Sequence, residues 1–296
     1  RFLNKERTMK PEDFSSYWLQ LEQELIRVEP APECTEIPLR STPEGKVFGL
    51  QLTSLGGYRI FAYYCVPHGK GPFPVIYRLP NYGSVVHIPP FEERCNHISI
   101  ALCHRGQRLS DEPFAASYPG LLTLGIESPQ TYIYRDITSD CLRVMDFLLT
   151  REEVDHRRIS LVGGDLAFWT AAMRPQALTL FYTPSMFYKS LQKASTSSHY
   201  PLEEFNDYFR AFPKSRKQVE TTLEYFEPMN FAPWVSISTM MMEESEGDGD
   251  DLTAAFGREI DRCTTYHSSF RDGVRQAQWI ADKLKTGKPL LPEHWS

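Results

Sequence analysis

Hydrophobic and polar positions follow two different periods along the chain, and each period predicts a different kind of element. Residues 47–55 and 58–66 alternate apolar and polar side chains on either side of a Gly-Gly pair, which predicts an antiparallel β-hairpin. Residues 10–30 and 131–149 place apolar side chains three or four positions apart, as in a helix with one buried face. We therefore expect an N-terminal helix over 10–30, followed by a pair of antiparallel strands.

Longer apolar runs predict buried strands, which alternate with helical segments in the rest of the chain. The expected strands are 73–79, 97–103, 158–164, 177–184 and 235–242, and the expected helices among and after them are 131–149, 166–173, 219–233 and 272–284. This order favours an α/β fold, with a mostly parallel, doubly wound sheet and the antiparallel N-terminal hairpin at its edge. No break in composition divides the chain, so we expect one domain over 1–296 with a helical insertion over 182–226.

Composition and charge exclude several classes of function. The net charge is −6, whereas nucleic-acid-binding domains have a basic footprint, and no apolar run approaches the ~20 residues of a membrane-spanning helix. Six cysteines are scattered without a CxxC pair, and no HExxH motif occurs, so neither a metal site nor a cofactor is predicted. The chain does not begin with Met, which is compatible with a removed signal peptide; the compartment stays open, with the cytoplasm favoured.

One stretch, residues 158–173, has the pattern of a buried strand, a tight turn and a helix. Asp165 stands at the apex of the turn, with Gly163 and Ala167 at the positions of the two small residues in the G-x-S-x-G nucleophile elbow. Small residues are needed there because the turn from strand to helix is sharp. Taken alone, the motif allows an altered nucleophile or an aspartate that caps the helix by accepting a backbone N–H, and it favours the cap.

Three longer segments, 118–148, 199–210 and 222–233, carry a resemblance to a known family. They resemble the acetyl xylan esterase and cephalosporin C deacetylase family, whose members are carbohydrate and antibiotic deacetylases with the α/β-hydrolase fold. The resemblance extends from about Pro11 to the terminal helix. It implies a single α/β-hydrolase domain, an acetylated carbohydrate or small ester as ligand, and a homo-oligomer, because relatives assemble into rings.

The resemblance also implies positions for catalytic groups. Asp165 falls at the family's serine nucleophile, and Leu166 after it would donate an oxyanion-hole N–H. Asn81 falls at the residue whose backbone N–H is the second oxyanion donor. Glu244 falls at the acid of the triad. His267 is the candidate for the histidine, although its alignment needs a gap and the family's His-Glu-Gly sequence is absent.

Further residues are implied around the pocket. Tyr82 follows directly in the second oxyanion loop, and Arg105 and Gln107 match the family's Arg-Gly-Gln loop, in which His104 falls near an aspartate. An arginine in such a loop could bind an anionic or sugar ligand. We prefer a structural role, in which the loop braces its neighbours around the pocket.

An aspartate at the elbow changes the chemistry that the family site permits. A serine esterase needs a hydroxyl that a histidine deprotonates and two donors aimed at the oxyanion. A carboxylate attacks an acetyl ester poorly, and its charge would stand beside the oxyanion that the site must stabilise. We therefore favour a protein that keeps the fold without the deacetylase activity. The alternative is an active hydrolase of the haloalkane dehalogenase or epoxide hydrolase kind, with Asp165 as nucleophile and His267 and Glu244 as partners, so whether the chain is an enzyme stays open.

Overall fold

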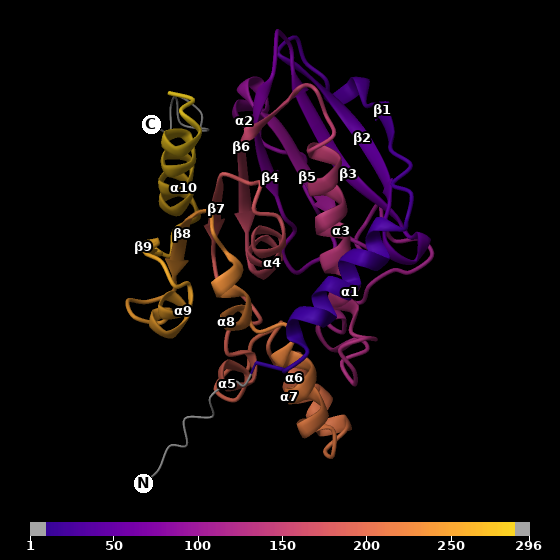
Figure 1. Cartoon of the computed structure of the whole chain (residues 1–296), viewed down its shortest axis with the longest axis vertical. Coiled ribbons are helices and arrows are strands. Elements are labelled where there is room, and N and C mark those ends of the chain that lie inside the picture. Colours follow the sequence, from indigo (N-terminus) through magenta and orange to yellow (C-terminus); the bar gives the residue numbers. More distant parts are fainter. Residues whose placement is uncertain (1–9, 288–296) are drawn as a thin grey trace.

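A twisted sheet of nine strands runs through the part of the protein that the computed structural model describes, residues 10–287 (Figure 1). The strand order is β1-β2-β3-β5-β4-β6-β7-β8-β9. The first three pairings, β1 with β2, β2 with β3 and β3 with β5, are antiparallel, and all the others are parallel. The strands are β1 (Glu33–Glu36), β2 (Gly45–Thr53), β3 (Arg59–Pro67), β4 (Phe73–Arg78), β5 (Ile98–Cys103), β6 (Val154–Gly163), β7 (Thr179–Tyr182), β8 (Ser238–Glu243) and β9 (Asp261–Thr264).

Helices cover both faces of this sheet. They are α1 (Phe14–Ile26), α2 (Phe91–Asn96), α3 (Ile133–Leu148), α4 (Asp165–Met173), α5 (Ser190–Ala194), α6 (Glu203–Ala211), α7 (Arg216–Glu224), α8 (Pro228–Phe231), α9 (Asp250–Ala255) and α10 (Ser269–Leu284). Neighbouring residues of one strand supply opposite faces: Leu161 belongs to the large core beneath α1, α3 and α4, whereas Val162 packs with Ile280 of α10. The predicted α/β architecture, an antiparallel N-terminal hairpin that leads into a parallel sheet, is confirmed.

The elements that the sequence did not predict are short and polar. Strands β1 and β9 are four residues each and mostly exposed, and α2 and α9 are helices of six residues. Such segments bury too few apolar side chains to show a period. The predicted single helix over 219–233 is wrong in one respect, because α7 ends at Glu224 and α8 begins at Pro228, where a proline is favoured in the first turn.

An aromatic core joins the N-terminal helix to the carboxyl ends of the strands. Phe14, Trp18, Leu21 and Leu25 form the buried face of α1, as the helical spacing predicted. The Trp18 indole Nε1 donates to the Tyr225 carbonyl oxygen at 3.1 Å, so α1 is fastened to the segment after α7. The same core reaches inward to Phe187, whose ring centroid lies 4.8 Å from that of Trp169 on α4.

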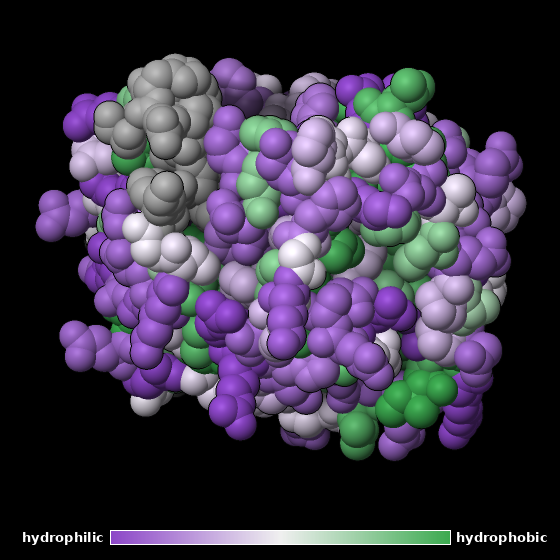
Figure 2. All heavy atoms as spheres, turned by 90° about the horizontal axis from the view of Figure 1, so that it is seen from above, coloured by the Kyte–Doolittle hydropathy of each residue, from purple (hydrophilic) through white to green (hydrophobic). Residues whose placement is uncertain are grey.

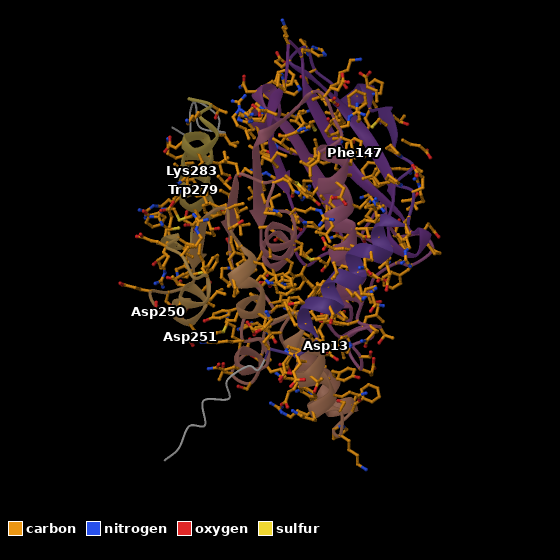
Figure 3. All side chains as sticks on the ribbon, viewed as in Figure 1. Asp13, Phe147, Asp250, Asp251, Trp279 and Lys283 are labelled. Atoms are coloured by element: carbon orange, nitrogen blue, oxygen red, sulfur yellow. The ribbon has the colours of Figure 1, made fainter. Side chains whose placement is uncertain are left out.

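The outer elements are held by polar contacts. Asp261 on β9 accepts from the Trp279 indole of α10 at 3.0 Å and pairs with the Lys283 ammonium at 3.2 Å, which fastens the last helix to the edge strand. Figure 3 labels Trp279 and Lys283 on this helix. Seen from above, polar side chains cover most of the surface and apolar ones form small separate groups (Figure 2). Within residues 10–287, no helix is both long and apolar enough to cross a membrane.

Candidate functional site

The turn between β6 and α4 is built on two consecutive glycines. Gly163 has a φ of 155°, and a Cβ there would lie 3.3 Å from the Leu79 carbonyl oxygen. A Cβ on Gly164 would lie 2.7 Å from the Ser185 hydroxyl. The chain therefore needs glycine at both positions to bring the start of α4 against the loop after β7. The result is the strand-turn-helix that the sequence predicted, with Asp165 as the first residue of the helix.

The Asp165 carboxylate is buried and bonded through both oxygens. Its Oδ2 accepts from the Ser185 hydroxyl at 2.8 Å and from the backbone N–H groups of Met186 at 2.8 Å and Phe187 at 3.0 Å. Its Oδ1 accepts from the Tyr182 hydroxyl at 2.9 Å. These donors all belong to β7 and the loop that follows it. The interpretation of Asp165 as a helix cap is therefore wrong, because its side chain binds this loop and the N-cap is Gly164.

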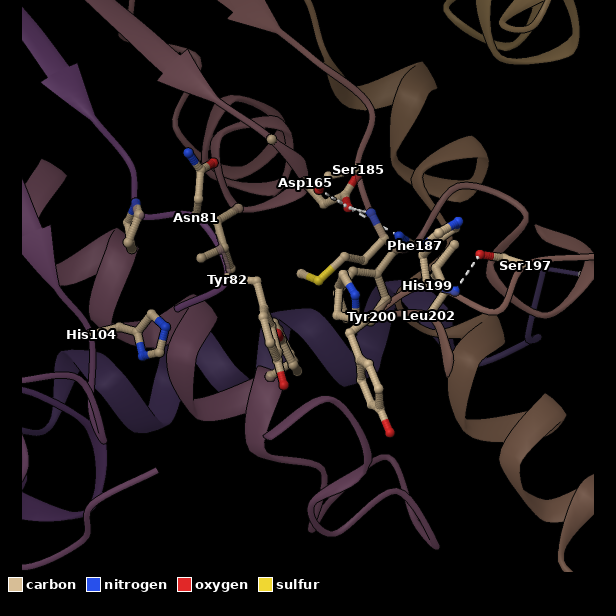
Figure 4. A pocket seen from close by; sticks show the side chains of 16 residues that line it. Asn81, Tyr82, His104, Asp165, Ser185, Phe187, Ser197, His199, Tyr200 and Leu202 are labelled. Carbon is tan, nitrogen blue, oxygen red and sulfur yellow. Dashed lines mark hydrogen bonds between the residues drawn. The ribbon is translucent and has the colours of Figure 1, made fainter. Parts of the chain in front are cut away.

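A cavity of about 320 Å³ opens beside this carboxylate (Figure 4). It lies at the carboxyl ends of the parallel strands β4, β5, β6 and β7, the edge at which α/β sheets bind ligands. Its lining residues come from the loops after β4, β5 and β7, the turn into α4 with the start of that helix, helix α3, and the segment between α5 and α6: Pro80, Asn81, Tyr82, His104, Tyr134, Gly164, Asp165, Leu166, Ser185, Met186, Phe187, Ser197, His199, Tyr200, Pro201 and Leu202.

Asn81 and Leu166, the two expected oxyanion residues, both line this cavity. The N–H of Leu166 belongs to the first turn of α4, where N–H groups have no partner inside the helix. The loop that carries Asn81 is held by Gln107, whose side-chain Nε2 donates to the carbonyl oxygens of Asn81 at 3.3 Å and Gly83 at 2.7 Å. Two backbone positions thus face the same space as Asp165.

Tyr82 also lines the cavity, and its hydroxyl donates to the buried carboxylate of Glu204 on α6. Arg105 does not line the cavity. Its guanidinium pairs with Asp140 at 2.7 Å and with Asp136 at 2.8 Å, so these two ion pairs hold it against α3. Gln107 and Arg105 therefore hold loops in place, which supports the preference for a structural role.

Glu244 and His267 lie together but apart from this cavity. The His267 Nδ1 is 3.8 Å from Glu244 Oε1, and the two side chains are 67% and 79% exposed. Glu244 lines a second cavity of about 100 Å³ between β8 and the loop after β7. Neither residue is among those that line the Asp165 cavity. The structure brings two of the three expected triad positions together and separates them from the third.

His104 lines the cavity, a position that was not predicted from the sequence. Its Nδ1 lies 2.7 Å from the Arg105 carbonyl oxygen, which only accepts, so Nδ1 carries the proton and Nε2 is the acceptor. Burial lowers the pKa of the His104 imidazole to about 4. The side chain is thus a neutral imidazole at neutral pH. Its position directly after the buried strand β5 was the available sequence signal, whereas the exposed His199 gave none.

The family model for acetyl xylan esterase (AXE1) matches residues 3–249. The chain belongs to the acetyl xylan esterase family. It is 22% identical over 247 residues to the acetyl esterase Axe7A of Xylanibacter ruminicola, a match that covers 78% of this chain and 55% of that protein. The chain thus spans about half the length of this curated relative.

Solved structures of acetyl xylan esterases have the same fold. The enzyme from a Paenibacillus species superposes with a TM-score of 0.78 at 21% identity, over 94% of this chain and 96% of that one. Acetyl xylan esterase 1 from a Thermoanaerobacterium species gives a TM-score of 0.76 at 20% identity, over 94% and 95% of the two chains. At this level of identity the likeness establishes the α/β-hydrolase fold.

In this member of the acetyl xylan esterase family, a second buried acid, Glu227, lies next to the loop that follows β7. Glu227 accepts from the Lys189 backbone N–H at 3.1 Å, at the end of the loop that Asp165 holds. Burial raises the pKa of Glu227 to about 7, and the charge of Asp165 contributes in the same direction. Within residues 10–287, no group of three His, Cys, Asp or Glu side chains could hold a metal ion. The site therefore offers a fixed carboxylate, a neutral imidazole and backbone N–H groups.

Proposed function

We propose that this protein binds an acetylated carbohydrate or small ester in the Asp165 cavity and does not hydrolyse it. The observation that carries the proposal is the bonding of Asp165. Four donors from β7 and the following loop hold both carboxylate oxygens, so the residue at the nucleophile position acts as an anchor for the cavity wall. An engaged carboxylate is a poor nucleophile toward an ester carbonyl, since attack gives an anhydride that readily reverts.

The rest of the site supports the same proposal. Serine-esterase chemistry needs a histidine within hydrogen-bond reach of the nucleophile and an acid that orients it. Glu244 and His267 are exposed and outside the cavity. The cavity, by contrast, is lined largely by aromatic and other apolar side chains and has a volume of about 320 Å³, within the usual range for small-ligand sites, about 300–1,000 Å³.

Two measurements test this proposal. Acetate release from acetylated xylo-oligosaccharides and from p-nitrophenyl acetate should not exceed the rate in buffer, while calorimetry should detect binding of an acetylated xylo-oligosaccharide. The Asp165→Asn variant is the matched control, because it keeps the shape of the side chain and removes its charge. Turnover by the wild-type protein that Asp165→Asn abolishes would show the proposal to be wrong.

The second candidate function is a hydrolase that uses Asp165 as a carboxylate nucleophile. The observation in its favour is that His104 and His199 line the same cavity, so a histidine could activate water there without His267. Such an enzyme displaces a leaving group at an sp³ carbon and then hydrolyses the ester that it has formed. Incubation of His104→Gln with a haloalkane or an epoxide, followed by mass spectrometry, would reveal an alkylated Asp165. We expect the peptide to stay unmodified.

Assembly into a homo-oligomer belongs to the same proposal, because the family resemblance implies it. Light scattering coupled to size-exclusion chromatography measures the mass directly. A mass several times that of the 34.2 kDa chain is the expected result. A monomer at micromolar concentration would remove this part of the proposal and leave the ligand site untouched.

A further inference from the structure

The Asp165 carboxylate is a buried charge whose partners are all neutral. The residue is 2% exposed, and it accepts from two hydroxyls and two backbone amides. None of the ion pairs formed within residues 10–287 includes it. Buried charges in proteins are usually paired, because the loss of hydration is costly unless an opposite charge offsets it. Asp165 therefore leaves one negative charge unbalanced at the cavity wall.

The other residues that line the cavity include no lysine or arginine within the described chain. Their two histidines are His104 and His199. His104 is neutral, since its Nδ1–H donates to a backbone carbonyl and its pKa is lowered by burial, whereas His199 is exposed. The neighbouring Arg105 guanidinium is neutralised by its two carboxylate partners on α3. A cationic ligand would consequently meet no lysine or arginine in the cavity, whereas an anionic one would meet Asp165.

Four aromatic rings belong to the remaining wall. Tyr82, Tyr134, Phe187 and Tyr200 line the cavity, and Figure 4 shows three of these rings, Tyr82, Phe187 and Tyr200, around the same space as Asp165. The faces of aromatic rings carry negative partial charge and attract ammonium groups, and cages of such rings recognise quaternary ammonium ligands. A site for a neutral sugar needs only aromatic rings for stacking. This cavity combines such rings with an unbalanced carboxylate, which a cation can use.

Glu204 strengthens the negative potential on the Tyr82 side. Its buried carboxylate accepts from the Tyr82 hydroxyl and from the Leu122 backbone N–H at 3.0 Å. A phenol that donates to a carboxylate has a more electron-rich ring, which favours contact with a cation. Two acidic groups thus lie on two sides of one aromatic cavity, Asp165 in its wall and Glu204 behind Tyr82.

We propose that the cavity selects organic cations, with the substituted ammonium group of the ligand placed between the aromatic faces and Asp165. This inference rests on the proposed function, because it names the class of small ester that the cavity holds without hydrolysing it. The substitution of the family serine by aspartate then exchanges a nucleophile for a counter-charge. At low local dielectric a carboxylate attracts an ammonium group across several ångströms, so direct contact is not required.

Acetylcholine and its neutral isostere 3,3-dimethylbutyl acetate test this proposal, because they differ only in the charged nitrogen. Calorimetry should show that the wild-type protein binds acetylcholine at least about tenfold more tightly than the isostere, the order expected for a desolvated cation against aromatic faces. Asp165→Asn should remove most of this preference. Glu246→Gln, which removes the same charge from an exposed loop, should retain it.

A second variant keeps the test informative if Asp165→Asn does not fold. Tyr200 is 55% exposed, so Tyr200→Leu should fold normally and remove one ring face from the cavity. Its acetylcholine affinity should fall about threefold or more, while its affinity for the neutral isostere should hardly change. Equal affinities for the two esters in the wild-type protein, or no binding of acetylcholine, would overturn the inference. Acetate release from acetylcholine would instead contradict the proposed function and leave the cation preference measurable from the two affinities.

Discussion

The carboxyl ends of β6 and β8 carry the residues that the sequence predicts at the family's nucleophile and acid positions, and the two side chains differ in burial and in bonding. At β6, Asp165 is buried and accepts four hydrogen bonds. At β8, Glu244 is exposed, and its contact with His267 is an exposed pair at 3.8 Å. Glycines and buried donors define the elbow around Asp165, whereas the loop after β8 is held by the buried Glu243, which accepts from the Gly249 N–H at 3.1 Å, and leaves the Glu244 side chain exposed. The shape of the turn at Asp165 therefore does not depend on the position of Glu244 and His267.

The largest expected difference between the two regions concerns the removal of each carboxylate. Asp165→Ala should lower the free energy of unfolding by about 3–5 kcal/mol, because it leaves the Met186 and Phe187 amides and the Tyr182 hydroxyl without their acceptor. Glu244→Ala should change it by less than about 0.5 kcal/mol, as is usual for exposed sites. Denaturant unfolding of both variants measures the contrast, and similar losses would refute it.

The next largest effect is the pH dependence of the free energy of unfolding that Glu227 causes. The pKa of Glu227 is raised from 4.5 to about 7, so the folded state favours the protonated acid. The corresponding stabilisation, about 3 kcal/mol, is fully present below pH 4.5 and is lost as the pH rises through 7. Glu227→Gln should lack this loss, so its stability relative to the wild type should increase between pH 5 and pH 8.

Thermal or urea unfolding at several pH values measures this trend. Glu244→Gln, which removes a carboxylate from the exposed region, is the matched control and should stay within about 0.5 kcal/mol of the wild type at each pH. A difference in unfolding free energy between Glu227→Gln and the wild type that stays constant from pH 5 to pH 8 would contradict the raised pKa of Glu227.

A smaller effect separates two tyrosines. Tyr182 is fully buried and donates to Asp165, so Tyr182→Phe should cost about 1.5–3 kcal/mol, the range for a hydrogen bond to a charged group. Tyr266, next to His267, is 41% exposed and lies against the guanidinium groups of Arg271 and Arg275 through its ring. Tyr266→Phe keeps that ring and should change stability by less than about 0.5 kcal/mol. Equal costs in urea unfolding would mean that Asp165 does not depend on Tyr182.

The smallest expected effect is that of His267. His267→Ala should leave both stability and ligand affinity unchanged within about 0.5 kcal/mol, because the side chain is 67% exposed and does not line the Asp165 cavity. Calorimetric titration of the variant with the ligand that the wild type binds is the appropriate measurement. A tenfold loss of affinity would place His267 in the site and reverse the contrast between the two regions.

Much of the fold could be predicted because its central elements bury apolar side chains with a regular period. The hairpin of β2 and β3, the buried strands β4 to β7 and the turn at Asp165 all followed from such patterns. The partners of Asp165 could not be predicted, since Met186 and Phe187 donate through backbone amides, which every residue except proline possesses, and the Ser185 hydroxyl belongs to a loop without any period. His104 could have been found as a polar residue directly after a buried strand at the ligand-binding edge, whereas His199 lies in a segment without any period.

The four donors around Asp165 also determine how well a serine would fit at this position. Serine offers one oxygen on a shorter side chain, so it cannot accept from Tyr182, Ser185 and two backbone amides at once. A single Asp165→Ser exchange would therefore release the loop that forms the cavity wall. A serine at this elbow would require coordinated changes in β7 and its loop, so one substitution is not enough to install it.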